Sequence, residues 1–539
     1  MDKKYFNKKL IKRMFGDAGS LNVSEIKNQL NELDKIFSKN FKKNSPRVFS
    51  YNKEKPSLIE EDPKDLMDTF SGLQYYFDHC LNWRSVRTQF NVTPPPSLIS
   101  ISSQVLVDMV NPTLATEIGC GNLLQLEKEI TRFISHLVGW NDKESIGIFT
   151  FGGTGTNLYG MKIGLNKSQP SISLEGVKDV VFIDNDQTHS CHRTACDWLG
   201  VGINNDIILK TYDGIINPNE LEEAMVNVIK KNKKIGCIIL NGGESYDYSV
   251  DPIYDVYKVR EKVCKKFDLN YKPHIHVDSV SGWVFLMFNN YDFSKNPLSF
   301  SKESLNKIKA MNSKIKQLKY ADSFGVDFHK TGFTQYISSL FMLKNKRDIQ
   351  FIAEGSRGAT AQSFEISGYS PGQYTLETSR SAIGPVSAYV TLSSLGIKGF
   401  QYLIGNFMDV AEDLRSRLRK DKTFILCNGQ ALGWCTLFII NLFNKKLSFQ
   451  EVLSYDQSKQ DKINNYQKEF YKYLNEGKNK NKWVFSLSGR YKIRAFKLYP
   501  MSPYTSKKNN DEILNWIKQN KKEFDKRYYD TARNKQIFE

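Results

Sequence analysis

Lys330 has the most unusual chemical surroundings in this sequence. It stands in the stretch DFHKTG (residues 327–332), between an apolar run at 321–326 and a strand-like run at 336–343. Lysine is almost never fully buried without a partner. A lysine between two core strands can form an imine with a carbonyl cofactor, because desolvation lowers its pKa and makes the amine nucleophilic. Taken alone, the motif fits an ordinary loop lysine as well.

An aspartate ends another apolar run upstream. Asp278 closes the stretch HIHVD at 274–278, which predicts a position at the carboxyl end of a core strand. Ligands of parallel sheets bind at that edge. The carboxylate is therefore a candidate to pair with a protonated ring nitrogen of a cofactor. A helix-capping aspartate after a strand is the alternative interpretation.

Two glycines followed by hydroxyl residues form a third candidate. The stretch FTFGGTGTNL at 149–158 predicts a tight turn that leads into a helix. Backbone N–H groups at a helix N-terminus can bind phosphate, and small side chains allow close approach. The stretch contains neither GK[ST] nor GxGxxG, so it is not one of the common nucleotide-binding loops. A plain glycine-rich turn is the alternative.

A histidine lies just past the apolar run at 180–183. His189, in DQTHS at 186–190, is placed to stack on a flat cofactor ring. A lone histidine there also fits a helix cap or a surface position. His192 competes for the same role and ranks lower.

These candidates require a sheet that brings several strand ends together. Short apolar runs alternate with amphipathic stretches between residues 145 and 345. This alternation predicts a mainly parallel sheet with right-handed crossovers. A long helical region at 385–418, later strand-like runs and a terminal helix predict a smaller C-terminal α+β domain. The expected division is an N-terminal extension with a helical segment (1–110), a large domain (111–385) and a small domain (386–539).

The four stretches, in this order, resemble the group II pyridoxal 5′-phosphate (PLP)-dependent decarboxylases. That family includes glutamate, aromatic-amino-acid and tyrosine decarboxylases. The resemblance spans about residues 110 to 505 and is clearest from 147 to 345. It implies the α/β fold of fold-type-I PLP enzymes, with a mainly parallel seven-stranded sheet, helices on both faces and a small C-terminal α+β domain. It also implies a homodimer with the active site at the subunit boundary.

The resemblance assigns roles to the cofactor-binding residues. Lys330 matches the lysine that holds PLP as a Schiff base, and Asp278 matches the acid that pairs with the pyridinium nitrogen. His189 matches the histidine that stacks on the ring. The residues implied to bind the phosphate are Gly153, Thr154 and His329.

Two further assignments concern the substrate and its protonation. Arg380, in ETSR at 377–380, matches a position that contacts the substrate carboxylate or its neighbourhood, with a solvated helix arginine as the alternative. In the loop region after the lysine, Tyr369 is the nearest candidate for the tyrosine that returns a proton to Cα. Phe364 competes for that aligned position. A phenylalanine there would favour an oxidative outcome, in which decarboxylation with loss of the amine gives an aldehyde.

The chain departs from the family pattern at several positions. Phe328 stands where the family usually has proline, and Ser279 where it commonly has alanine. Glu244 puts an acid near the cofactor, where a hydroxyl residue is expected. The segment 288–320 lengthens the spacing between the aspartate and the lysine, as in the tyrosine decarboxylase branch.

The composition excludes several other classes of protein. Of the 539 residues, 40% are hydrophobic and 25% charged, which is ordinary for a globular protein. No apolar stretch approaches the roughly 20 residues of a membrane helix, and the basic N-terminus lacks the apolar core of a secretory signal. We therefore expect a cytoplasmic protein without membrane contact. The net charge of +18 is spread along the chain, so no nucleic-acid partner is expected. The eight cysteines are scattered without a CxxC pair, so neither a disulfide framework nor a metal site is expected.

These observations predict a PLP-dependent carboxy-lyase that converts a small-molecule L-amino acid to its amine and CO2 through Lys330. The sequence does not identify the amino acid. One alternative is another PLP reaction on the same fold, such as decarboxylation-dependent aldehyde synthesis or aldehyde-lyase chemistry. The other is a non-catalytic binding protein that kept the fold.

Overall fold

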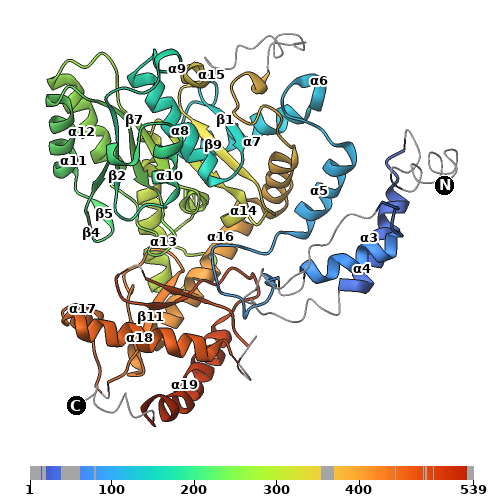
Figure 1. The fold of residues 1–539 in the computed structure, drawn as a ribbon, viewed down its shortest axis with the longest axis vertical. Coiled ribbons are helices and arrows are strands. Elements are labelled where there is room, and N and C mark those ends of the chain that lie inside the picture. Colours follow the sequence, from blue (N-terminus) through green and yellow to red (C-terminus); the bar gives the residue numbers. More distant parts are fainter. Residues whose placement is uncertain are drawn as a thin grey trace.

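A seven-stranded sheet forms the centre of the molecule (Figure 1). The computed structural model describes residues 20–37, 61–77, 80–353, 370–443, 445–476, 482–489 and 491–530, together with Met14 and Asn479. The strand order is β1-β9-β8-β7-β6-β2-β3. The strands are β1 (Ile146–Thr150), β2 (Val180–Asn185), β3 (Asp206–Leu209), β6 (Lys234–Asn241), β7 (His274–Asp278), β8 (Ser323–Asp327) and β9 (Ser339–Leu343).

The sheet is parallel from β8 through β7, β6 and β2 to β3, and β9 runs antiparallel to both of its neighbours. The prediction of a mainly parallel seven-stranded sheet is therefore confirmed. The reversal of β9 has a simple cause. The link from β8 to β9 contains only the short helix α14 (Phe328–Thr331) and a turn, whereas a parallel connection needs a crossover of a dozen or more residues.

Helices cover both faces of this sheet, as expected. Alternate residues of a strand point to opposite faces. Val180 and Phe182 pack with helix α8 (Gly153–Ser168), while Val181 and Ile183 belong to the cluster on the other face. That second layer contains α7 (Leu123–Val138), α11 (Pro218–Lys230) and α12 (Ile253–Lys266). The central strands are continuous apolar runs because both of their faces are buried.

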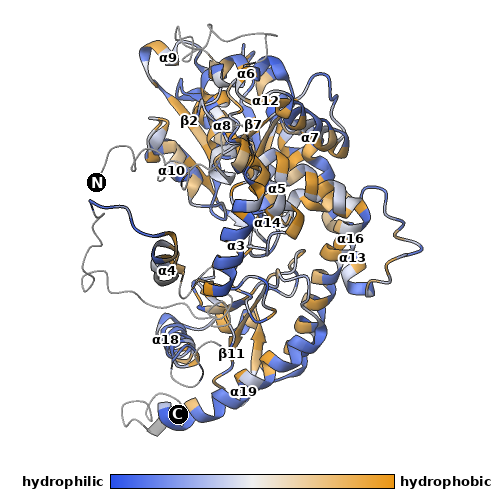
Figure 2. Cartoon of the chain, turned by 90° about the vertical axis from the view of Figure 1, so that its right-hand side faces the viewer, coloured by the Kyte–Doolittle hydropathy of each residue, from blue (hydrophilic) through white to orange (hydrophobic). Residues whose placement is uncertain are grey.

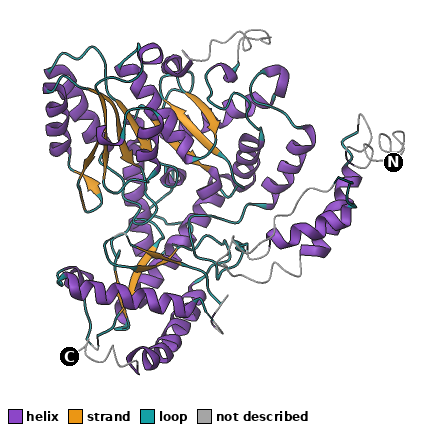
Figure 3. Cartoon of the chain, in the orientation of Figure 1, coloured by secondary structure: helices purple, strands orange, loops and turns teal. Residues whose placement is uncertain are grey.

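A four-stranded antiparallel sheet forms the C-terminal part, in the order β10-β11-β13-β12. Helix α16 (Ile383–Lys420) leads into it and is interrupted at Gly396, whose φ is 56°. This agrees with the predicted small α+β unit (Figure 3), while the division of the chain at residues 110 and 385 stays a prediction. The elements are β10 (Phe424–Leu426), β11 (Thr436–Ile440), β12 (Ser486–Ser488), β13 (Ala495–Leu498), α17 (Phe449–Leu453), α18 (Gln457–Leu474) and α19 (Lys507–Asp530).

The N-terminal helices lie to one side of the body in Figure 1, the side that faces the viewer in Figure 2. Helices α3 (Val23–Phe37) and α4 (Leu66–Phe77) contact each other through the rings of Phe37 and Phe77, whose centroids are 5.3 Å apart. Helix α5 (Leu98–Val110) packs against α16.

The lengthened segment between Asp278 and Lys330 is folded. Its helix α13 (Lys302–Ile315) packs against α16 and the 3₁₀ helix Gly282–Phe288. Within the described part of the chain, no helix is both long enough and apolar enough to cross a bilayer. The remaining short elements are α6 (Glu117–Cys120), α9 (Ile172–Glu175), α10 (Cys191–Trp198), α15 (Gln350–Ala353), β4 (Thr211–Tyr212) and β5 (Ile215–Ile216).

Candidate active site

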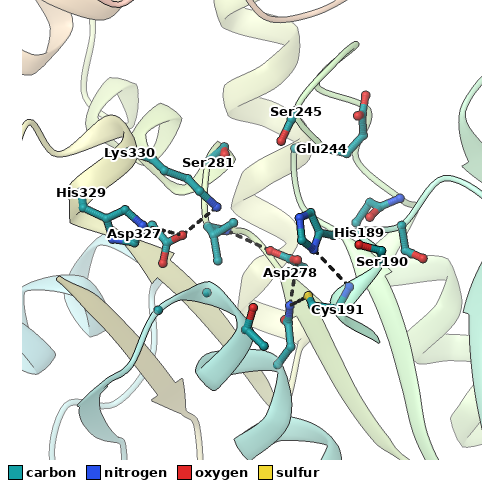
Figure 4. Close-up of a pocket in the computed structure, with 18 of the residues that line it drawn as sticks. His189, Ser190, Cys191, Glu244, Ser245, Asp278, Ser281, Asp327, His329 and Lys330 are labelled. Carbon is teal, nitrogen blue, oxygen red and sulfur yellow. Dashed lines mark hydrogen bonds and ion pairs between the residues drawn. The ribbon is translucent and has the colours of Figure 1, made fainter. Parts of the chain in front are cut away.

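A cavity of about 520 Å³ lies at the carboxyl ends of the central strands (Figure 4). It is lined by segments that are far apart in the sequence, each from a different strand end: 151–154 after β1, 187–191 after β2, 241–246 after β6, 278–281 after β7 and 327–330 after β8. Parallel sheets bind ligands at this edge. Gly153, Thr154, His189, Asp278, His329 and Lys330, which the sequence singled out, all line this one cavity.

Lys330 faces the cavity from helix α14 and forms an ion pair with Asp327. The lysine Nζ lies 2.7 Å from Asp327 Oδ2. Burial alone lowers the pKa of Lys330, but the charges of Asp327 and Asp278 outweigh it and raise that pKa above its ordinary value. The expectation of a lowered lysine pKa was therefore wrong. Asp327 is instead placed to accept the proton that Nζ must lose before it attacks a carbonyl.

Asp327 is a residue of the cavity to which the sequence argument gave no role. It is fully buried at the end of β8 and accepts a hydrogen bond of 2.5 Å from the Ser339 hydroxyl. Its signal in the sequence was its position three residues before Lys330, because residues at this spacing meet on one side of a helical turn.

Asp278 lies on the neighbouring strand β7 and is held by two side chains. His192 Nε2 is 3.2 Å from Asp278 Oδ2, and Asn157 Nδ2 donates to the same oxygen at 2.9 Å. Burial raises the pKa of Asp278, but the hydrogen bond and charge of His192, with Lys330, outweigh burial and hold that pKa well below its ordinary value. Asp278 is thus an anion that faces the cavity, as a partner of a protonated ring nitrogen must be.

The glycine turn between β1 and α8 provides a cradle for an anion. Gly152 has a φ of 115°, which favours glycine. A Cβ at Gly153 would lie 2.8 Å from Asp327 Oδ2, so a side chain there would crowd the lysine's partner. The first turn of α8 has no side-chain cap. Its N–H groups, with Thr154 beside them, are therefore available to a phosphate.

The two predicted histidines lie at different places on the cavity wall. His189 Nδ1 accepts a hydrogen bond from the backbone N–H of Cys191 at 3.2 Å, and the ring borders the cavity on the Asp278 side (Figure 4). His329 Nδ1 lies 3.2 Å from the carbonyl oxygen of Ser338. The His329 ring packs against Tyr336, with centroids 4.2 Å apart. Tyr336 also lines the cavity and is a second residue that the sequence argument missed.

Arg380 is neither solvated nor part of a helix. It is 6% exposed, and its Nη1 lies 2.6 Å from Glu127 Oε2. It lines a second cavity of about 340 Å³ that adjoins the first and shares Phe151, Tyr336 and Ile337 with it. The alternative of a solvated helix arginine is therefore wrong, and contact with a substrate carboxylate stays a prediction.

The departures from the family pattern have local explanations. The carboxylate of Glu244 accepts hydrogen bonds from the backbone N–H groups of Tyr246 at 2.8 Å and Asp247 at 2.5 Å. Glu244 lines the cavity, but these bonds engage its charge in the turn that follows β6. Phe328 is fully buried and packs against Phe149. Tyr369 and Phe364 lie outside the described residues.

The residues of the cavity fit PLP. An amine, a carboxylate and an uncapped helix N-terminus match its aldehyde, its ring nitrogen and its phosphate. Bound there, PLP would serve as a sink for the electrons of a breaking bond at Cα. The sheet and the cavity at its edge together place the protein in the fold-type-I class of PLP-dependent proteins.

Comparison with known proteins identifies the family. The pyridoxal-dependent decarboxylase conserved domain matches residues 57–438, and the chain belongs to that family. It is similar to the acidic amino acid decarboxylase GADL1 of Xenopus tropicalis, with 28% identity over 200 residues that cover 36% of each chain. It is also similar to the L-2,4-diaminobutyrate decarboxylase of Acinetobacter baumannii, with 20% identity over 277 residues that cover 48% of each chain. The chain thus spans about half or less of the length of these curated relatives.

Solved structures agree on the fold. Mouse CSAD in its apo form superimposes with a TM-score of 0.76 at 14% identity, over 92% of this chain and 99% of that one. At this identity the likeness extends to the fold alone.

Proposed function

We propose that the protein is a PLP-dependent decarboxylase that converts an L-amino acid to its amine and CO2, with Lys330 as the lysine that binds the cofactor. The observation that supports this most directly is the position of the Lys330 amine and the Asp278 carboxylate, which face one cavity from the ends of the neighbouring strands β8 and β7. In the reaction the bond from Cα to the carboxylate breaks, and a proton takes the place of CO2 on Cα.

Each of the following residues has a separate proposed role in the reaction. Asp327 accepts the proton of Lys330, to which it is ion-paired. Asp278 keeps the cofactor's ring nitrogen protonated. Gly153, Thr154 and His329 bind the phosphate, and His189 stacks on the ring and keeps water from that face. Tyr369 is the proposed donor of the proton to Cα.

The second cavity is the proposed place for the substrate side chain. Among the described residues that line it, the ionised side chains are Glu377 and Arg380. Glu377 accepts hydrogen bonds from Thr150, at 2.6 Å, and from Tyr159. Arg380 is already neutralised by Glu127. The described residues of this wall offer no unpaired cation to a second carboxylate, so neutral or cationic side chains suit it better than acidic ones.

Exposed apolar side chains support a homodimer. On helix α5, Leu98 and Val110 are 73% and 56% exposed, and on the adjoining helix α16 Tyr389 and Tyr402 are also exposed. Exposed apolar side chains on two adjoining helices are typical of an interaction surface, and a second copy of the chain is the proposed occupant.

A product assay tests the proposal. The PLP-loaded protein is incubated with each common amino acid, and CO2, amine, aldehyde and peroxide are measured. CO2 and amine in equal amounts are the expected products, with acidic amino acids among the poorest substrates. If aldehyde and peroxide form instead of the amine, the proposed reaction would be decarboxylation-dependent aldehyde synthesis and not simple decarboxylation. A protein that binds PLP but releases no CO2 from any amino acid would refute the proposal. Glutamate or aspartate as the best substrate would refute the assignment of the second cavity.

A further inference from the structure

His192 bridges two carboxylates, that of Asp278, which faces the cavity, and that of Asp184, which is buried behind it. Its Nε2 lies 3.2 Å from Asp278 Oδ2 and its Nδ1 lies 3.0 Å from Asp184 Oδ2. His192 is fully buried and Asp184 is 2% exposed. The ring therefore links the end of strand β2 to the end of strand β7.

Between two carboxylates, this geometry favours a positively charged ring. A neutral imidazole carries one N–H and one lone pair, so one carboxylate would face a lone pair, whereas an imidazolium donates from both nitrogens. Burial by itself lowers the pKa of His192, but the charge of Asp184 and the hydrogen bonds to both carboxylates outweigh it, and that pKa lies well above its ordinary value. Asp184 is fixed in turn, because it accepts hydrogen bonds from Asn185 N at 2.8 Å and from the Thr188 hydroxyl at 3.1 Å.

A second chain of hydrogen bonds reaches Asp278 from the other side and carries no charge. Asn157 donates to Asp278, and its Oδ1 lies 2.8 Å from His276 Nε2. His276 Nδ1 lies 2.8 Å from the Ser323 hydroxyl. Burial lowers the pKa of His276 to about 3, so this ring is neutral, with its N–H directed at Asn157.

Two sets of hydrogen bonds therefore hold Asp278. We call His192 with Asp184 the charged arm, and Asn157 with His276 and Ser323 the neutral arm. The neutral arm orients Asp278, while the charged arm also fixes its ionisation. A carboxyl buried without a cation has a raised pKa and tends to be neutral. A neutral carboxylic acid would not hold the ring nitrogen of a cofactor in its protonated form. With Asp184 and Asp278 as anions and His192 as a cation, the group carries one net negative charge, which a single pyridinium would balance.

We propose that His192 is a positioning residue, whose imidazolium, anchored on Asp184, keeps Asp278 ionised and directed at the ring nitrogen of the bound cofactor. The inference rests on the proposed PLP site. Cys191, His192 and Asp278 also approach one another closely enough to suggest metal ligands. However, both ring nitrogens of His192 already face carboxylates, which makes the ion-paired arrangement the better account.

The test compares His192→Gln with Ser323→Ala, which removes from the neutral arm the hydroxyl that lies between His276, at 2.8 Å, and His274, at 2.7 Å. His192→Gln keeps a hydrogen-bond donor but removes the charge. It should weaken PLP binding by roughly ten- to hundredfold, the scale of a lost charge-assisted contact. It should also move the pH titration of the bound cofactor's absorbance. Ser323→Ala should change PLP affinity by less than about threefold, since a neutral hydrogen bond contributes little net free energy.

A second measurement uses the protein without PLP. In ¹⁵N-histidine spectra, His192 should show a doubly protonated ring at neutral pH and above. Asp184→Asn should bring its titration toward the ordinary histidine value of about 6.5. If His192→Gln fails to fold, Asp184→Asn decides the matter alone. Unchanged PLP affinity with unchanged titration would overturn the inference, as would a neutral His192 ring in the wild type. Failure of the wild type to bind PLP would instead overturn the proposed function.

Discussion

Replacing Arg380 with alanine should destabilise the protein by about 3–5 kcal/mol, the cost of leaving one partner of a buried ion pair behind. The guanidinium lies 2.6 Å and 3.2 Å from the two carboxylate oxygens of Glu127, which is fully buried. It also donates to the carbonyl oxygens of Phe149 at 2.8 Å and Leu114 at 3.3 Å. Without the guanidinium, Glu127 keeps the hydrogen bond from the backbone N–H of Phe149 at 2.8 Å.

Urea unfolding of the PLP-free protein, followed by tryptophan fluorescence, measures this loss. The double variant Arg380→Met/Glu127→Met removes both charges and should recover at least half of the lost free energy, since apolar replacements of buried pairs are often neutral. A loss below about 1 kcal/mol for Arg380→Ala, the value typical of exposed pairs, would refute the reasoning. So would a double variant no more stable than the single one. The KM for the amino acid distinguishes a structural role of Arg380 from a role in substrate binding. If Arg380 binds the substrate, its loss should raise KM in the double variant even when the stability is recovered.

Lys330→Ala should abolish the borohydride-reducible PLP adduct and let dialysis remove the cofactor; an adduct at the wild-type level would assign the role to another amine. Asp278→Asn should keep the circular dichroism spectrum but lose most activity, because the ring nitrogen is no longer held protonated. An undiminished rate would reduce Asp278 to a strand-end cap. Gly152→Ala should weaken PLP binding, because the φ of 115° disfavours a side chain, and calorimetric titration with PLP checks this. The protein should sediment as a dimer, and a monomer with full activity at nanomolar concentration would contradict the shared site.

The parts of the site that could be predicted from the sequence are those marked by local pattern. Each residue proposed to bind the cofactor ends or follows an apolar run, and parallel strands place such positions at one edge of the sheet. For that reason Asp278 and Lys330 line one cavity although they are 52 positions apart in the sequence. The reversal of β9 could also have been predicted from the sequence, since the link from β8 is too short for a crossover.

The partners of these residues could not be predicted from the sequence, because they come from elements whose contact depends on the whole fold. Glu127 lies on α7 and meets Arg380 only when α7 packs beside β1. That contact turns an arginine expected at the substrate or in solvent into half of a buried ion pair. Likewise, the pKa of Lys330 is raised rather than lowered, because its desolvation is opposed by Asp327 and Asp278.

His189 and His192 show how a small structural difference separates two roles that the sequence leaves in competition. Helix α10 begins at Cys191, so His189 precedes the helix whereas His192 lies in its first turn. The residue before the helix borders the cavity. The residue within it is turned inward, between the ends of β2 and β7, where Asp184 and Asp278 meet both of its ring nitrogens. The two histidines therefore have complementary proposed roles. His189 borders the space proposed for the cofactor, and His192 fixes the charge of Asp278, the acid proposed to contact the cofactor.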